Sequence, residues 1–337
     1  MIPLHKESSD YLTDALTYYD LSDHVDPTLI AHTVRLLTDF DMHPYFYRHP
    51  ERSLFALAVA ERWNHRSTYK EKYALESVLK LVSTGLDEKN RYTTYSGYVK
   101  KLSLNKAVSG TLYDPEAYLH SPYSAYHTDL KSYVLNNTNE VLSNQIEHEL
   151  HSPASPLFAS VRRRLTITKH TEKPVRIRIV NHTYAELTQH YVGFAAFYTT
   201  TLGEPTLVLG KDFTPGMLQH EYAHSQSTGM WRWYQLLLFR GITEAITESL
   251  IDDPSVYVKQ RDVYNDIIST HPKLKKLFLR TYMGDEEARR KLFAMIIVHY
   301  GLSGFLSLAR LAPVDNPLMT GKVGSYVFIK PQRMQLC

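Results

Sequence analysis

A short segment of this chain, 218–224, carries residues that suit metal binding. His220 and His224 are four residues apart, so on a helix both imidazoles project from one face. That spacing lets two ring nitrogens reach one tetrahedral ion, and zinc is the ion that such sites prefer. Glu221 follows His220 directly, where its carboxylate would contact a water on the ion. Glu244, twenty residues beyond His224, is the candidate for the third ligand.

The spacing of these residues distinguishes the motif from a chance pattern. With 17 His in 337 residues, H-E-x-x-H should arise in roughly a few chains per hundred of this composition. The simpler alternative is a helix with two surface histidines and an exposed glutamate. Glu244 and Glu248, one turn apart in an apolar segment, favour the metal site. Segment 148–151 has the same residue types, but its histidines are three apart, and we interpret it as the solvated end of a helix.

Composition narrows the class of protein. Hydrophobic content of 43% and charged content of 22% are those of an ordinary globular protein. The net charge of +3 is too small to indicate a nucleic-acid partner, and the basic run 162–164 fits a solvated helix end. The single cysteine, Cys337, allows no intrachain disulfide and favours a reducing compartment. The first residues show no apolar signal core, and the most apolar run, 292–300, is too short to span a bilayer. We therefore expect a cytoplasmic protein with no membrane partner.

The hydrophobic pattern predicts an α+β protein that is predominantly helical. Three short strands are expected, at 175–180, 191–200 and 206–210, and Thr214 should cap the helix that carries the histidines. We expect the third strand to form a sheet edge near the metal, where an extended peptide could pair with it. Helices are expected at 29–37, 54–63, 73–82, 128–151, about 156–164, 255–270, 272–283 and 285–311. The hydrophobic periodicity changes from helical to strand-like after about residue 166. This change predicts a helical N-terminal domain at 1–165 and a second domain at 166–337.

Three parts of the chain together resemble the gluzincins. They are the hairpin formed by the expected strands 191–200 and 206–210, the segment His220-Glu221-Tyr222-Ala223-His224, and the later Thr243-Glu244-Ala245-Ile246-Thr247-Glu248. Gluzincins are zinc metallopeptidases such as the thermolysin-like enzymes and related aminopeptidases, and the resemblance covers about residues 170–310. It implies a zincin-like catalytic domain with a small mixed sheet and a helical lower lobe. It also implies Zn²⁺ held by His220, His224 and Glu244, with Glu221 as the general base and Glu248 hydrogen-bonded to a ligand histidine. No Gly-x-Met-x-Asn-like segment precedes the histidines, so the resemblance does not extend to an aminopeptidase activity.

The chemistry expected from this resemblance is hydrolysis of peptide bonds, most simply by an endopeptidase acting on peptides or proteins. Glu221 would accept a proton from the attacking water and pass it to the leaving amine. A second electrophile often assists, and Tyr234, His299 and Tyr300 are candidates that can equally be packing residues. Two other functions remain open. One is a non-catalytic binding or regulatory protein on a zincin scaffold, and the other is zinc-dependent hydrolysis of a non-peptide amide.

Overall fold

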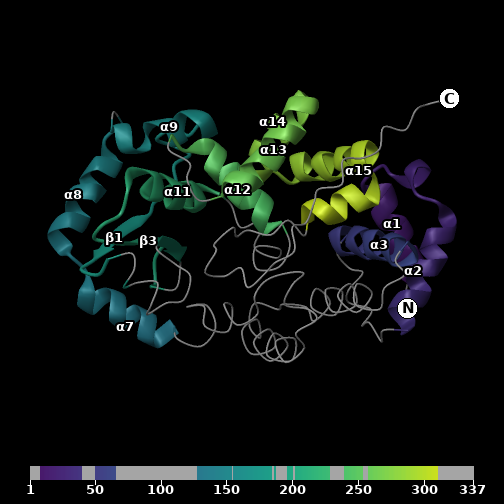
Figure 1. Ribbon diagram of the computed structural model, residues 1–337, viewed down its shortest axis with the longest axis horizontal. Coiled ribbons are helices and arrows are strands. Elements are labelled where there is room, and N and C mark those ends of the chain that lie inside the picture. Colours follow the sequence, from purple (N-terminus) through teal and green to yellow (C-terminus); the bar gives the residue numbers. More distant parts are fainter. Residues whose placement is uncertain are drawn as a thin grey trace, which may run out of the picture.

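The protein is mostly helical and carries one small sheet (Figure 1). The computed structural model describes residues 8–39, 50–65, 127–153, 155–183, 186, 196–199, 202–227, 239–252 and 257–309. The sheet and its helices lie at one end of Figure 1, and the first and last described helices lie together at the other. Helix α12 (Arg240–Leu250) lies between these two groups. This arrangement confirms the α+β class at the coarse level of helices with a small sheet.

The sheet has three described strands in the order β1-β3-β2. Strand β1 (Arg176–Val180) runs parallel to β3 (Thr206–Gly210), and β2 (Ala196–Thr199) runs antiparallel to β3. The expectation that 206–210 is an edge strand is therefore wrong, because β3 is the central strand and is buried along its whole length. Strand order depends on contacts between distant segments, and a local pattern does not encode it.

The outer edge of β1 is covered by helix α8 (Glu140–His151). The Ile177 N–H donates to a carboxylate oxygen of Glu147 at 2.9 Å, and the Ile179 N–H donates to the Ser143 hydroxyl at 2.9 Å. Side chains of the helix thus satisfy strand donors that would otherwise form an open edge. Among the described strands, this leaves β2 as the sheet edge beside the histidine-bearing helix.

The expected single helix over 128–151 is two helices, α7 (His127–Asn137) and α8. The break falls at Thr138, which forms an isolated antiparallel bridge with Val180, at the end of β1. The next residue, Asn139, caps α8 because its side chain accepts the Leu142 N–H at 3.1 Å. Pairing with the sheet therefore overrides the helical periodicity. The 148–151 segment is the last turn of α8 and its two histidines are exposed, as expected.

The other expected elements within the described residues are present. The N-terminal helices are α1 (Ser8–Tyr18), η1 (Ser22–His24), α2 (Pro27–Asp39) and α3 (Pro50–Asn64). The remaining helices are α9 (Pro156–Leu165), α11 (Pro215–Gln226), α12, α13 (Val258–Thr270), α14 (Pro272–Tyr282) and α15 (Glu286–Ala309). The helix expected at 73–82 and most of the strand expected at 191–200 lie outside the described residues.

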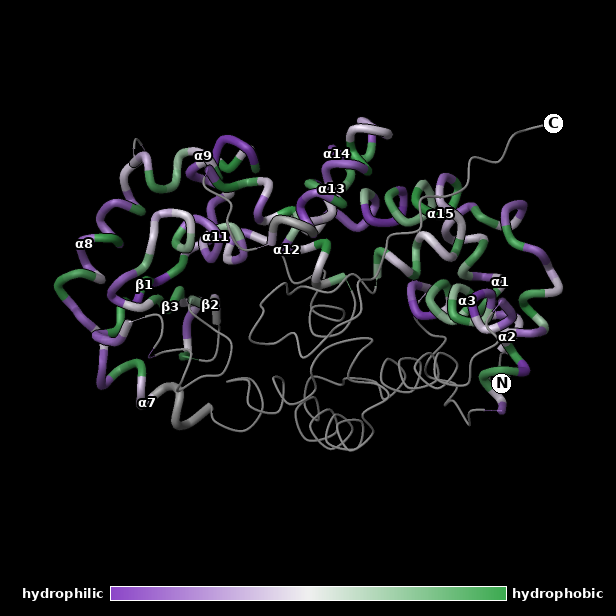
Figure 2. The backbone as a smooth tube through the Cα atoms, viewed as in Figure 1, coloured by the Kyte–Doolittle hydropathy of each residue, from purple (hydrophilic) through white to green (hydrophobic). Residues whose placement is uncertain are grey.

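Helix α15 packs against α3, α12 and α14, and the hydrophobic residues of α3 and α15 contribute to one large core (green in Figure 2). Within the described part of the chain, α15 is the helix that is long and apolar enough to cross a membrane. Half of its most apolar window is buried inside the protein, and Gly301 interrupts its helical geometry with φ +69°. Its apolar composition is thus accounted for in large part by core packing.

Helices α7 and α8 pack on the sheet and α9 packs on α11, whereas α1 and α2 pack on α3, which itself packs against α15. The segments that the sequence places in one N-terminal domain therefore contact both ends of the molecule (Figure 1). The boundary at residue 165 stays a prediction.

Candidate metal centre

Helix α11 carries His220, Glu221 and His224, and both of its ends are fixed. At its start the Thr214 side chain accepts the Met217 N–H at 3.2 Å, and Pro215 occupies the first turn, as the sequence predicts. At its end the Lys173 ammonium donates to the carbonyl of Gln226 at 2.8 Å and to that of Ser227 at 2.5 Å. A cation there satisfies free carbonyls and opposes the negative end of the helix dipole.

The face of α11 opposite the histidines is held by a polar cluster of the buried Tyr222 with the partly buried Glu172 and Arg162. The Tyr222 hydroxyl donates to Glu172, and the Arg162 guanidinium donates to the same carboxylate from Nε at 3.0 Å and from a terminal nitrogen at 2.8 Å. Arg162 also donates to the carbonyls of Leu150 and Ser152. These bonds fix the rotation of α11 about its axis, and with it the direction of the two imidazoles.

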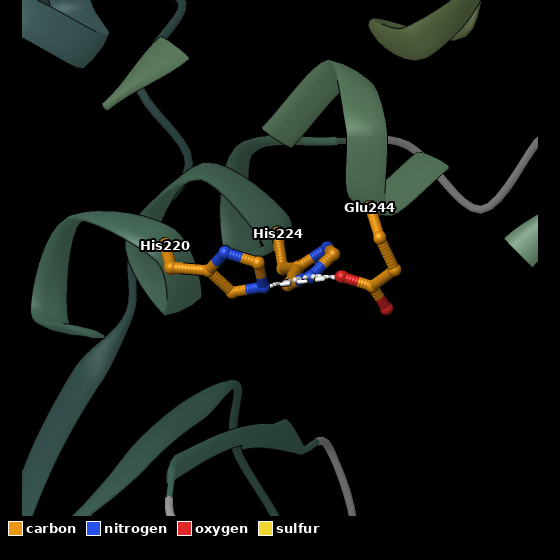
Figure 3. A group of neighbouring side chains, drawn as sticks. All are labelled: His220, His224 and Glu244. Carbon is orange, nitrogen blue, oxygen red and sulfur yellow. Dashed lines mark hydrogen bonds and ion pairs between the residues drawn. The ribbon is translucent and has the colours of Figure 1, made fainter. Parts of the chain in front are cut away.

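Two histidines and one glutamate meet at a single point between α11 and α12 (Figure 3). His220 Nε2 and His224 Nε2 lie 3.0 Å apart, and Glu244 Oε2 lies 3.1 Å from the first and 3.0 Å from the second. The three predicted ligands thus present one atom each to a nearly equilateral triangle. Among the described residues, this is the place where three such side chains bring ligand atoms within 4.8 Å of one another.

The triangle fits a metal ion. Tetrahedral ligands at a zinc–nitrogen distance of about 2.1 Å lie about 3.4 Å from one another, so the atoms need to move apart by only a few tenths of an ångström. Two imidazole nitrogens and one carboxylate oxygen are a donor set found in zinc sites with an open fourth position. The arrangement can therefore hold a divalent ion, and its donors favour zinc over calcium or magnesium.

Glu248 holds the other nitrogen of His220. Its Oε1 lies 3.0 Å from His220 Nδ1, so a neutral imidazole donates its Nδ1–H there and directs its Nε2 lone pair toward the triangle. The ring of Tyr257 stacks on His220 with centroids 5.5 Å apart. Spacing alone did not rank Glu244 above Glu248, but the geometry places Glu244 at the triangle and Glu248 behind His220.

The carboxylates around His220 control its charge when no ion is bound. Burial lowers the pKa of His220, but the hydrogen bonds with Glu244 and Glu248 outweigh burial and raise the pKa to about 10. Burial also raises the pKa of the Glu244 carboxyl, but the neighbouring His224 and His220 outweigh it and bring the pKa well below its usual value. The metal-free site thus holds a proton among these groups near neutral pH, and an ion would have to displace it.

Glu221 is buried beside the triangle and does not form part of it. Burial raises the pKa of its carboxyl, while His220, His224 and the backbone N–H of Tyr198 oppose that rise. Strand β2, which carries Tyr198, packs against α11, and this contact places the sheet edge beside the site. A carboxylate in this position can accept a proton from a group bound near the two histidines.

Other residues considered from the sequence lie elsewhere. His299 stacks on His271 with ring centroids 4.1 Å apart, and Tyr300 meets the same ring edge-on, so neither is placed at the triangle. His182 Nδ1 lies 2.7 Å from the Tyr133 hydroxyl, so this histidine is also placed away from the triangle. Tyr234 lies outside the described residues.

The sequence reasoning missed three residues that contact or support this site: Tyr198, Tyr257 and Glu172. Tyr198 acts through its backbone, which no residue type reveals. Tyr257 and Glu172 come from segments that lie beside α11 only in the folded chain. No local spacing signal points to them.

No family model, curated protein or solved structure matches this chain. The resemblance to gluzincins therefore rests on the residues of the chain itself.

Proposed function

We propose that this protein is a zinc-dependent metallopeptidase of the gluzincin kind, acting as an endopeptidase on peptides or proteins. The observation that carries the proposal is the triangle of His220 Nε2, His224 Nε2 and Glu244 Oε2, with edges of 3.0 to 3.1 Å. Supporting it are Glu221 next to the triangle and Glu248 behind His220. We also infer a cytoplasmic location, on the basis of the single cysteine.

Each residue has a defined part in this proposal. His220, His224 and Glu244 would hold the zinc ion, which when bound supplies a Lewis acid for the scissile carbonyl and an acidified water. Glu221 takes the proton of the attacking water and returns it to the leaving amine. Glu248 keeps His220 in the tautomer that directs Nε2 to the site. The backbone of Tyr198 favours the charged form of the Glu221 carboxyl, because it lowers the pKa that burial raises.

The edge of β2 supports a peptide as the substrate. Strand β2 pairs with β3 on one side, and no described strand pairs with its other side. Alternate residues of a strand direct their backbone N–H and C=O groups to such a free side. An extended peptide could pair with this edge and bring one carbonyl toward the ligand triangle.

A non-catalytic metal-binding protein is a second candidate, and the burial of the site favours it. Glu221 is 8% exposed and Glu244 is 5% exposed, which limits access of a bulky substrate to the described part of the site. Metal binding alone requires no base beside the ligands, so Glu221 is the residue that separates the two functions.

The test compares the wild-type protein with Glu221→Gln and with a matched control, Glu149→Gln, on helix α8. All three are loaded with zinc and assayed for cleavage of an unfolded protein, with a small amide as a second substrate. We expect Glu221→Gln to keep its zinc and to lose roughly 10²- to 10⁴-fold in rate, as general-base loss does, and the control to match the wild type. Wild-type cleavage by Glu221→Gln would contradict the peptidase mechanism. Zinc binding without hydrolysis by any variant would favour the second candidate.

A further inference from the structure

Tyr282, the last residue of α14, reaches the helix that carries the glutamates. Its side chain is fully buried, and its hydroxyl lies 3.0 Å from the Thr247 hydroxyl on α12. Thr247 follows Glu244 by three residues and precedes Glu248 by one. The contact therefore falls on the turn of α12 that presents both carboxylates to the histidines.

The hydroxyl protons define the direction of this bond. Thr247 donates its own proton to the Thr243 carbonyl at 2.9 Å, so its oxygen is left as an acceptor for the Tyr282 proton. A buried hydroxyl gains from such a bond because a buried polar group without a partner destabilises the fold. Tyr282 thus has a fixed partner on α12.

Tyr282 lies at the end of a helix that packs around the site. Its helix, α14, packs against α12, α13 and α15, and α12 in turn packs against α11. The bond between Tyr282 and Thr247 therefore acts on the helix that faces the two histidines.

We infer that Tyr282 is a positioning residue, which fixes the turn of α12 that lets Glu244 join His220 and His224 around one ion. It does not touch the ligand atoms. Its bond to Thr247 ties this turn of α12 to the end of α14. The inference rests on the metal site of the proposed function.

The test measures zinc affinity by competition with a chromophoric chelator. The variant is Tyr282→Phe, which keeps the ring and removes the hydroxyl. The control is Tyr19→Phe, the same change at a buried tyrosine that packs against Phe293 of α15. Thr247→Val removes the partner hydroxyl with little change of shape, and the double variant measures the coupling of the two. Melting of each metal-free protein records effects on stability alone.

We expect Tyr282→Phe to bind zinc roughly 10- to 100-fold more weakly than the wild type, as loss of outer contacts around a metal site does. Tyr19→Phe should bind as the wild type does, and the double variant should bind no more weakly than the weaker single variant. Wild-type affinity in Tyr282→Phe would overturn this inference and leave the metal site standing. So would an equal loss in Tyr19→Phe, or additive losses in the double variant. A wild-type protein that binds no zinc would overturn the proposed metal site as well.

Discussion

The different positions of Glu244 and Glu248 predict a ranking of two conservative substitutions. Glu244→Gln replaces a carboxylate oxygen that lies about equally close to both imidazoles, at 3.1 and 3.0 Å. Glu248→Gln changes a carboxylate that lies 3.0 Å from the far nitrogen of His220 and outside the triangle. Both changes keep the size of the side chain and remove one charge. A difference in zinc affinity between the two variants therefore reflects where each carboxylate lies relative to the ion.

The magnitude follows from the bond that each residue makes. A hydrogen bond to a charged group contributes about 1.5–3 kcal/mol, and each 1.4 kcal/mol is a factor of ten. Glu248→Gln should therefore weaken zinc binding by roughly 10- to 100-fold, which is the usual effect of an outer partner of a ligand. Glu244→Gln removes one of three protein ligands and should weaken binding by more than that.

The assay is a competition titration of each variant with a chelator of known zinc affinity, at constant pH. Glu149→Gln is the control, because it lies in the 148–151 segment that has the same residue types without the spacing. It should bind zinc as the wild type does. If Glu248→Gln lost more affinity than Glu244→Gln, the assignment of ligand and outer partner would be reversed and the reasoning refuted.

Three further predictions concern stability and charge. Arg162→Met should lower the free energy of unfolding by about 3–5 kcal/mol in denaturant titrations, because it leaves Glu172 partly buried without its cation, whereas Arg280→Met at an exposed pair should cost less than about 1 kcal/mol. Gly301→Ala should cost about 1–3 kcal/mol, measured by thermal melting, since φ +69° and ψ 177° suit only glycine and the added methyl meets no neighbour within 4 Å. In the metal-free protein, the pKa of His220 is raised to about 10, so its contribution to stability should be full below about pH 6.5 and fall as the pH rises toward 10. Thermal melting of chelator-treated protein at several pH values in this range tests this prediction. A His220→Gln protein whose stability has the same pH dependence as the wild type would contradict the prediction.

The candidate metal site was the most predictable part of the molecule because the spacing of its residues is local. His220, Glu221 and His224 lie within five residues of one helix, and Thr214 caps that helix as its position predicts. Glu244 was harder to predict, because it lies on a second helix, α12, and the local sequence does not show that this helix packs against α11. The geometry brings it to the histidines as the resemblance implies.

The features that the sequence did not predict depend on contacts between distant segments. Strand β3 is central because β1 and β2 pair with its two sides, and no alternation pattern records strand order. The helix expected over 128–151 breaks because Thr138 pairs with Val180, more than forty residues later. Tyr282 occupies a core position of α14 with Leu274 and Phe278, so its pattern predicts packing and conceals its contact with Thr247.

The central claim is that His220, His224 and Glu244 hold one metal ion. Its most direct test is the metal content per chain of the purified protein and of His220→Ala and His224→Ala, after exposure to equimolar zinc and removal of free ions. We predict close to one zinc per wild-type chain and little zinc in either variant, with the wild-type fold retained by circular dichroism. Wild-type zinc stoichiometry in both variants would contradict the claim.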